Sequence, residues 1–151
     1  MGSSPNGANI NNDGAGIEFH QGKICFTDKI IGHSNTFTNS PVKIAKENSL
    51  LLCVRAPVGE VNITDRCLCI GRGLAAISVL DKMKIDFLFY WLQSFKKSLM
   101  QKATGSTFVA ITADTVKSIV IPLPPLEEQN SICEAIDKIF TMLDAIEQSL
   151  N

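Results

Sequence analysis

The chain has 151 residues, 45% of them hydrophobic, and a formal net charge of −1. This length suits one domain with an appended element, and the apolar content is enough for a real core, which excludes global disorder. No apolar run approaches the roughly 20 residues that cross a bilayer, and the polar first residues lack a signal peptide's basic and apolar regions, so we expect a cytoplasmic protein without membrane contact.

The charge is unevenly distributed along the chain. Residues 126–151 contain six acidic residues against Lys138 alone, a net charge of −5, whereas residues 1–125 carry 13 basic and nine acidic residues, a net charge of +4. A mildly basic body is compatible with a polyanionic partner. On the charge count alone, ordinary solvated surface charge is the preferred interpretation.

Short strands and turns are predicted over the first half of the chain. Residues 1–22 are rich in Gly, Asn and Ser and indicate loop with a short strand near 17–19, and residues 23–41 alternate apolar and polar pieces without a helical period. The run 49–54 is rich in strand formers and is closed by a turn that contains Pro57 and Gly59. Further strands are expected at 61–64, 66–70 and 74–80.

The period then changes to that of a helix. Ile85, Leu88, Leu92, Phe95 and Leu99 are spaced 3, 4, 3 and 4 residues apart, which places them on one helix face. Asp81 or Asp86 is a candidate cap for its start. The segment 103–107 ends the helix, and two strands are expected at 108–111 and 118–123.

After three prolines the chain has its most regular pattern. Pro125 followed by Glu127 and Glu128 signals a helix start, and about 26 residues of helix extend roughly 39 Å. Apolar residues then follow a heptad seam with spacings of 4, 3, 4, 3 and 4: Ile132, Ile136, Ile139, Leu143, Ile146 and Leu150. Such a seam favours a partner helix, although packing onto the chain's own body is the alternative. The fold class is α+β: a strand-rich domain over 1–123 with a packed helix, and a coiled-coil-type helix over 124–151.

Reactive side chains form no recognisable catalytic pattern. The sequence has no phosphate-binding loop, nucleophile elbow or zinc-protease motif, and His20 and His33 stand alone in loop-like surroundings. Cys67 and Cys69 form a C-x-C pair without a second pair, so structural cysteines are favoured over a metal site, and the odd total of five argues against a disulfide framework. We therefore expect no catalytic residues, no metal and no cofactor in this chain.

Five blocks, taken in order, resemble the specificity subunits of type I restriction–modification systems. They are residues 2–5 and 16–23 (GSSP, GIEFHQGK), 50–59 (LLLCVRAPVG), 70–77 (IGRGLAAI), 87–92 with 103–107 (FLFYWL, ATGST) and 121–129 (IPLPPLEEQ). The pattern departs from the family in two respects: residues that usually precede the first block are missing, and one domain and one helix stand where the family has two of each. A half-length subunit or a piece of a longer one is therefore expected.

The resemblance implies a target-recognition domain that reads one half of a split site in double-stranded DNA, and a helix that packs in an antiparallel spacer. Partners would be a methylation subunit, which uses S-adenosylmethionine, and a restriction subunit, which uses ATP and magnesium. A homodimer or a second half-subunit would complete the spacer. Two other hypotheses stay open: a protein-interaction scaffold that binds through the heptad helix without DNA, and a small enzyme with an unrecognised pocket.

Candidate DNA contacts follow from side-chain chemistry and this resemblance. Cations and hydroxyls suited to phosphates are Lys23, Lys29, Arg72, Lys96, Lys97, Lys102, Ser106 and Thr107. Donors suited to base edges are His20, Gln21, Arg55 and Arg66. For each cation, solvated surface charge is the alternative.

Overall fold

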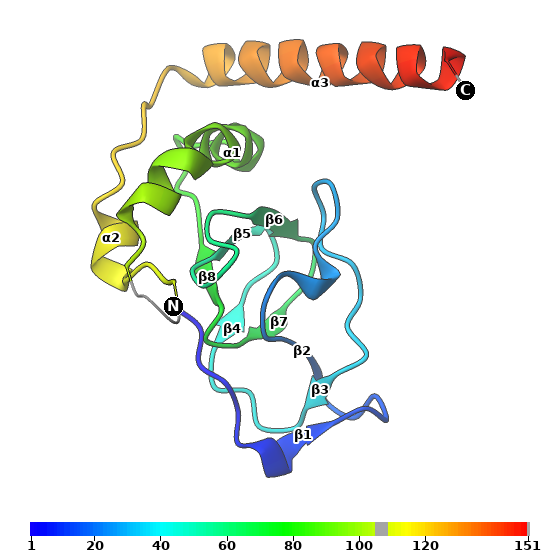
Figure 1. Ribbon diagram of the computed structural model, residues 1–151, viewed down its shortest axis with the longest axis vertical. Helices are drawn as coiled ribbons and strands as arrows, with labels where there is room; N and C mark the ends of the chain where they lie inside the picture. Colours follow the sequence, from blue (N-terminus) through cyan, green and yellow to red (C-terminus); the bar gives the residue numbers. More distant parts are fainter. Residues whose placement is uncertain (105–108, 151) are drawn as a thin grey trace.

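The computed structural model describes residues 1–104 and 109–150 (Figure 1). Its strands are β1 (Ile10–Asn11), β2 (Ile17–His20), β3 (Phe37–Thr38), β4 (Ile44–Ala45), β5 (Ser49–Cys53), β6 (Val61–Thr64), β7 (Leu68–Ile70) and β8 (Leu74–Ile77). Its helices are α1 (Ile85–Lys102), α2 (Ala113–Lys117) and α3 (Leu126–Ser149), with single 3₁₀ turns at Gly7–Asn9 and Lys23–Cys25. The predicted α+β class is confirmed.

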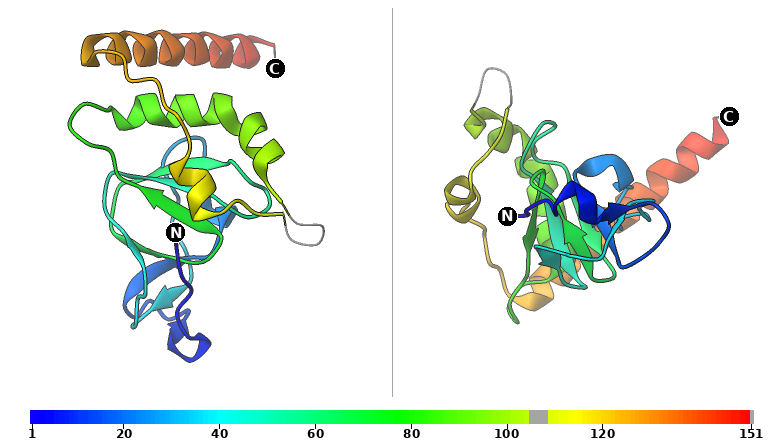
Figure 2. Two further views of the ribbon diagram at one scale, coloured as in Figure 1. Left: turned by 90° about the vertical axis from the view of Figure 1, so that its left-hand side faces the viewer. Right: turned by 90° about the horizontal axis from the view of Figure 1, so that it is seen from below.

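The elements stack in layers (Figures 1 and 2). A five-stranded sheet in the order β1-β3-β2-β7-β4 lies beside a three-stranded sheet in the order β6-β5-β8. Helix α1 covers the outer face of the smaller sheet, and α3 lies across α1 at the far end of the molecule. All strand pairs are antiparallel except β2 with β7, which brings the ends of these two strands, at His20 and Ile70, side by side.

Strand β5 is the centre of the body because both of its faces are buried. Leu50 and Leu52 point into a core formed with α1, whereas Leu51 and Cys53 point into a second core between the two sheets. Alternate residues of a strand face opposite sides, so burial of both faces favours apolar residues at successive positions. This explains why the run at 49–54 has no polar alternation.

Helix α1 packs as its spacing predicted. Leu88, Leu92 and Leu99 are buried in the core against β5, and Ile85 and Phe95 pack at its margin. The expected caps are wrong: the position before the helix is Lys84, and Asp86 lies inside the first turn. The Lys84 amide instead donates to the side chain of Gln129 on α3, 2.8 Å away.

The last predicted strand, 118–123, is also wrong. Ile119 and Ile121 do pack against the core while Val120 is exposed, so the alternation is real. However, this stretch forms no ladder in the described part of the chain, and Pro122 has no N–H to donate to one. Of the strand expected at 108–111, residue 108 lies outside the described range, and Ala110 makes isolated bridges to Arg55 and Thr104.

Several short elements escaped prediction. β1 and β4 are two residues each, too short for a detectable period. Helix α2 has five residues and starts at a Thr112 cap, whose hydroxyl accepts from the Thr115 amide at 3.1 Å. None of the described helices is long and apolar enough to span a membrane. The division of the chain at residue 123 stays a prediction.

Candidate nucleic-acid interface

Several predicted DNA contacts are held in ion pairs on the body. Lys96 and Lys23 both reach Glu60, with N–O distances of 2.8 and 3.5 Å, and the hydrogen bond from Lys96 lowers the pKa of Glu60. Lys29 pairs with Asp86 at 2.9 Å and lies 5.0 Å from the centre of the Tyr90 ring. These lysines are at least partly neutralised, which makes them weaker phosphate ligands than the sequence suggested.

Two of the predicted base readers belong to an internal cluster around Glu18. Arg66 donates to both carboxylate oxygens of Glu18, at 2.8 and 3.2 Å, and to the carbonyl oxygens of residues 31 and 32. His20 is 3% exposed and lies 3.1 Å from the same carboxylate, and His33 contacts it at 2.7 Å. Because both side chains are committed to Glu18, His20 and Arg66 are weaker candidates for base contacts than the sequence suggested. Their part in DNA binding stays a prediction.

The cluster around Glu18 shifts two pKa values downward. Burial works to raise the pKa of Glu18, but hydrogen bonds from Arg66, His33, the Ser34 amide and His20 outweigh it, and the pKa lies far below its ordinary value. Burial lowers the pKa of His20 despite its hydrogen bond to Glu18. The carboxylate therefore stays ionised and ties β2 to the 31–34 loop and to Arg66.

We expect Glu18→Gln to reduce the free energy of unfolding at neutral pH by about 1.5–3 kcal/mol, the usual contribution of a hydrogen bond to a charged group. Because the pKa of Glu18 is lower in the folded chain, its stabilisation is present above about pH 4.5 and is lost as the pH falls below that value. Buried His20 acts in the same direction from about pH 6.5 downward, since its imidazole takes up a proton more readily when unfolded.

Urea unfolding between pH 7 and pH 3 measures this effect. In Glu18→Gln the loss of stability below about pH 4.5 should be smaller than in the parent chain. Glu47→Gln is the matched control, because Glu47 is exposed and has no partner among the described residues. Equal stability of the two variants at every pH would contradict a structural role for Glu18.

Four of the predicted cations have no ion pair or side-chain hydrogen bond in the described part of the chain: Arg55, Arg72, Lys97 and Lys102, all exposed. The side-chain nitrogen of Lys102 lies 5.7 Å from the centre of the Phe95 ring. Arg55 lies in the turn after β5, at a hollow of about 380 Å³ that is also lined by Gln21, Lys23 and Gly73. Arg72 directly precedes Gly73 in the chain, so we define the Arg55 surface as Gln21, Lys23, Arg55 and Arg72.

Two glycines allow the parts of the Arg55 surface to meet. A Cβ atom on Gly71 would lie 2.4 Å from Oε1 of Gln21, and one on Gly73 would lie 2.4 Å from the Gln21 carbonyl oxygen. The Gly73 amide donates to that carbonyl at 3.2 Å, and Ser4 donates to Oε1 at 2.9 Å. Gln21 is thus held at the surface with its amide nitrogen free of described partners, as a base-edge donor requires.

Ser106 and Thr107 lie outside the described residues. The described residues on either side of them contact one another and the Arg55 turn. Ala110 forms isolated bridges with both Thr104 and Arg55, and the Ala56 amide donates to the Val109 carbonyl at 3.1 Å. Thr104 and Val109 therefore lie next to the Arg55 turn.

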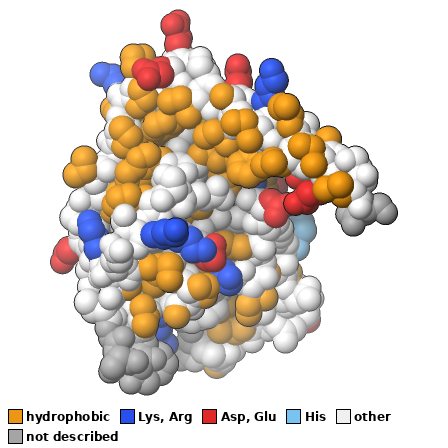
Figure 3. Space-filling view, turned by 45° about the horizontal axis from the view of Figure 1, so that its top comes forward, with side chains coloured by type: hydrophobic (Ala, Val, Ile, Leu, Met, Phe, Trp, Pro, Cys, Tyr) orange, Lys and Arg blue, Asp and Glu red, His pale blue; other side chains and the backbone are white. Residues whose placement is uncertain are grey.

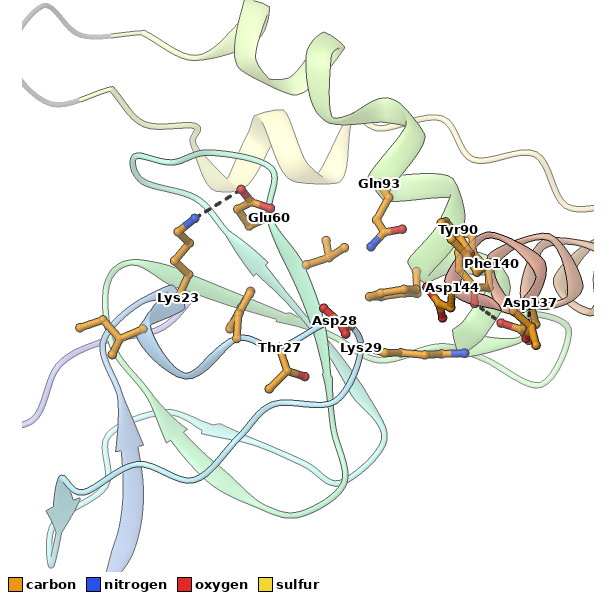
Figure 4. Close-up of a pocket in the computed structure, with 15 residues that line it drawn as sticks. Lys23, Thr27, Asp28, Lys29, Glu60, Tyr90, Gln93, Asp137, Phe140 and Asp144 are labelled. Atoms are coloured by element: carbon orange, nitrogen blue, oxygen red, sulfur yellow. Dashed lines mark hydrogen bonds and ion pairs between the residues drawn. The ribbon is translucent and has the colours of Figure 1, made fainter. Parts of the chain in front are cut away.

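A second and larger hollow, of about 970 Å³, lies between the 23–29 segment, α1 and α3 (Figure 4). Its walls carry two basic residues, Lys23 and Lys29, and four acidic ones: Asp28, Glu60, Asp137 and Asp144. A net negative lining repels phosphates. The smaller hollow at Arg55 is therefore the better candidate interface with nucleic acid.

Helix α3 leaves most of its heptad seam uncovered. Ile132 and Ile136 are half-buried, whereas Ile139, Leu143, Ile146 and Leu150 are 49–80% exposed. Figure 3 shows hydrophobic side chains gathered in a broad band over α3 and α1. The alternative that the seam folds onto the chain's own body is wrong for its C-terminal half.

Several structurally important residues were missed in the sequence. Glu18 is a polar residue of the short strand predicted near 17–19, and Gln129 is a polar residue of a predicted helix. No local pattern indicates their distant partners.

The five cysteines are all free thiols: Cys69 is buried, Cys67 is exposed, and burial raises the pKa of Cys53 to about 12. Among the described residues no group of three or more His, Cys, Asp or Glu side chains is placed to hold a metal ion. The absence of metal and cofactor stays a prediction.

Known proteins similar to this chain share one description. The family model "Type I restriction modification DNA specificity domain" matches residues 6–151. The "Putative type I restriction enzyme MjaX specificity subunit" of Methanocaldococcus jannaschii is 42% identical over 95% of this chain and 34% of its own length. The EcoBI specificity subunit of Escherichia coli is 28% identical over 70% of this chain and 23% of its own length.

Solved structures similar to this chain come from the same kind of restriction–modification system. The HsdS subunit from Thermoanaerobacter tengcongensis matches with a TM-score of 0.87 and 36% identity, over 99% of this chain and 36% of that one. A chain from a structure on complex assembly and conformational transition of the type I R-M system matches with a TM-score of 0.88 and 37% identity, over 99% of this chain and 37% of that one. The chain thus spans between 23% and 37% of the length of these relatives. With the family model covering nearly its whole length, the chain belongs to the family of type I restriction–modification DNA specificity domains.

Proposed function

We propose that this chain is one DNA-recognition unit of a type I restriction–modification system and that it contacts double-stranded DNA through the Arg55 surface. The observation that carries the proposal is Arg55, an arginine without an ion pair to a described residue, in the same hollow as the fixed amide of Gln21. Arg72, also without such an ion pair, lies in the chain between Gly71 and Gly73, which pack against Gln21. Guanidinium groups bind phosphates and the guanine edge, and an amide binds the adenine edge. Lys97 and Lys102 are further candidate phosphate contacts.

Helix α3 supplies the second half of the proposal. Its exposed seam suits pairing with the same helix of a second copy or of a second half-subunit, and its acidic residues keep the helix from binding phosphates. The paired units would then read the two halves of a split site and position methylation and restriction subunits on it.

In this proposal the methylation and restriction subunits catalyse the reactions. The chain itself would be non-catalytic and cytoplasmic, with S-adenosylmethionine bound by the methylation subunit and ATP and magnesium by the restriction subunit. The family description, a DNA specificity domain, supports this division of roles.

Fluorescence anisotropy with a pool of random 30-base-pair duplexes tests the proposal. Binding should weaken with salt, with a log–log slope of about −0.9 for each phosphate contact, and repeated selection from the pool should enrich one short sequence. Absence of binding by the chain both alone and together with methylation subunits would contradict DNA recognition. It would favour a scaffold that uses α3 alone.

A further inference from the structure

Gln129, in the first turns of α3, is a fully buried polar residue with every hydrogen-bonding atom of its amide engaged. Its side chain is 0% exposed. Oε1 accepts from the Lys84 amide at 2.8 Å, and Nε2 donates to the carbonyl oxygens of Lys82 and Pro124, each at 2.8 Å. A neutral amide can satisfy one donor and two acceptors at once, as this site requires.

These three bonds join segments that are distant in the sequence. Lys82 and Lys84 lead into α1, Pro124 lies in the proline-rich linker, and Gln129 belongs to α3. The Lys84 amide is one of the orphan donors at the start of α1, which no side chain of that helix caps. The start of α1 is therefore completed by a residue of α3, so the two helices share one joint.

A second group of contacts continues from this joint along α3. Cys133 is buried, Tyr90 donates a hydrogen bond to Asp137, and the rings of Tyr90 and Phe140 stack with centres 6.4 Å apart. Figure 4 shows Tyr90, Asp137 and Phe140 together where α1 and α3 meet. The line Gln129, Cys133, Asp137 and Phe140 is the face of α3 that lies on the body.

This body face fixes where the heptad seam points. Cys133, Asp137 and Phe140 each follow a seam residue by one position, which is about 100° around a helix of 3.6 residues per turn. Because the seam and the body face belong to the same helix, any rotation of α3 about its start turns the seam through the same angle. The helix side chains beyond Phe140 are exposed, and the contacts described above all lie in the first half of α3.

We propose that Gln129 is a positioning residue that locks α3 to the recognition body in one direction, so that body and seam form a single rigid unit. The carbonyls it engages cannot be satisfied by an apolar side chain, and the bonds allow one orientation of the helix start. If the proposed function is correct, this lock also fixes the distance between two recognition bodies joined through their seams, and hence the spacing of the two DNA half-sites.

Distance measurement by pulsed electron spin resonance tests the lock without DNA. One spin label goes on exposed Cys67 of the body and one on α3 as Gln148→Cys, in a Cys25→Ser background, with excess unlabelled chain to remove distances between copies. The parent should give one narrow distance. Gln129→Ala should widen the distribution at least twofold, whereas Asn130→Ala, an amide removed from the exposed neighbouring position, should leave it unchanged.

Gln129→Glu provides a test within one folded variant. A buried carboxylate at pH 8 has no proton to donate to the two carbonyls, so the distribution should be wide, and protonation at pH 5.5 restores one donor and should narrow it. The parent is measured at both pH values, because the acid response of Glu18 and His20 must not be mistaken for this effect. Narrow, unchanged distances in both Gln129 variants would overturn the proposal.

The DNA consequence has a separate readout. Duplexes with two copies of the selected half-site at increasing separations should bind the parent with a sharp optimum, which Gln129→Ala should flatten while affinity for a single half-site stays constant. A widened distance distribution in a chain that binds no DNA would support the lock and count against the proposed function. Unchanged distances would overturn the lock whatever the DNA result.

Discussion

Replacing Ile139 and Leu143 with lysine is expected to convert a dimer of this chain into a monomer. Both side chains lie on the exposed part of the α3 seam, 57% and 49% exposed, so the change removes nothing from the core of the body. A two-fold dimer would bury four of these side chains, and full burial of each contributes about 1.5–3 kcal/mol. Since each is already about half covered, the substitutions should remove about half of that, roughly 3–6 kcal/mol in total before charge repulsion is added. The dissociation constant should rise by at least about 10²-fold.

Sedimentation equilibrium or light scattering measures this mass change, and circular dichroism checks that α3 stays folded. The control is Asn130→Lys with Gln148→Lys, which adds the same charge to the exposed face of α3 opposite the seam. The control should keep the parent's mass. A lysine-substituted seam with an unchanged oligomer mass would rule out α3 pairing.

Arg55→Ala and Arg72→Ala are each expected to weaken DNA binding by about 5- to 150-fold, the effect of losing roughly 1–3 kcal/mol per contact. Neither side chain has an ion pair or hydrogen bond with a described residue, so stability should not change. The salt dependence separates the two possible roles. A lost phosphate contact lowers the log–log slope by about 0.9 for every sequence, whereas a lost base contact weakens only the selected sequence.

Lys82→Ala with Lys84→Ala is the matched control for this prediction. These exposed lysines lie at the start of α1, the opposite end of the helix from the residues next to the Arg55 turn, and only their backbone atoms contact Gln129. The control should bind DNA within about twofold of the parent, since only general electrostatic attraction changes. Equal losses in control and arginine variants would mean that the body binds DNA by net charge rather than through the Arg55 surface.

Much of the fold followed from local patterns. The helices at 85–102 and 126–149 were predictable because burial of one face imposes a period of 3.6 on the residues that form it. The strands at 17–20, 49–53, 61–64 and 74–77 were predictable as short runs of strand-forming residues between turn residues. Strand 118–123 was mispredicted because its alternation reflects packing onto the core without a neighbouring strand. The family resemblance was likewise present in the order of the blocks and agrees with the matched relatives.

The sequence by itself determined most of the helices and strands, the acidic heptad helix and the number of basic residues in the body. Only the tertiary structure decided which cations are free: Arg66 and His20 meet Glu18, and Lys96 meets Glu60, across separations that no local spacing encodes. It also decided how α3 attaches, through a buried amide that completes a helix start 45 residues away. Whether a charged or hydrogen-bonding side chain is available for binding depends on its partner within the fold. Partners that are distant in the chain are brought together only by packing.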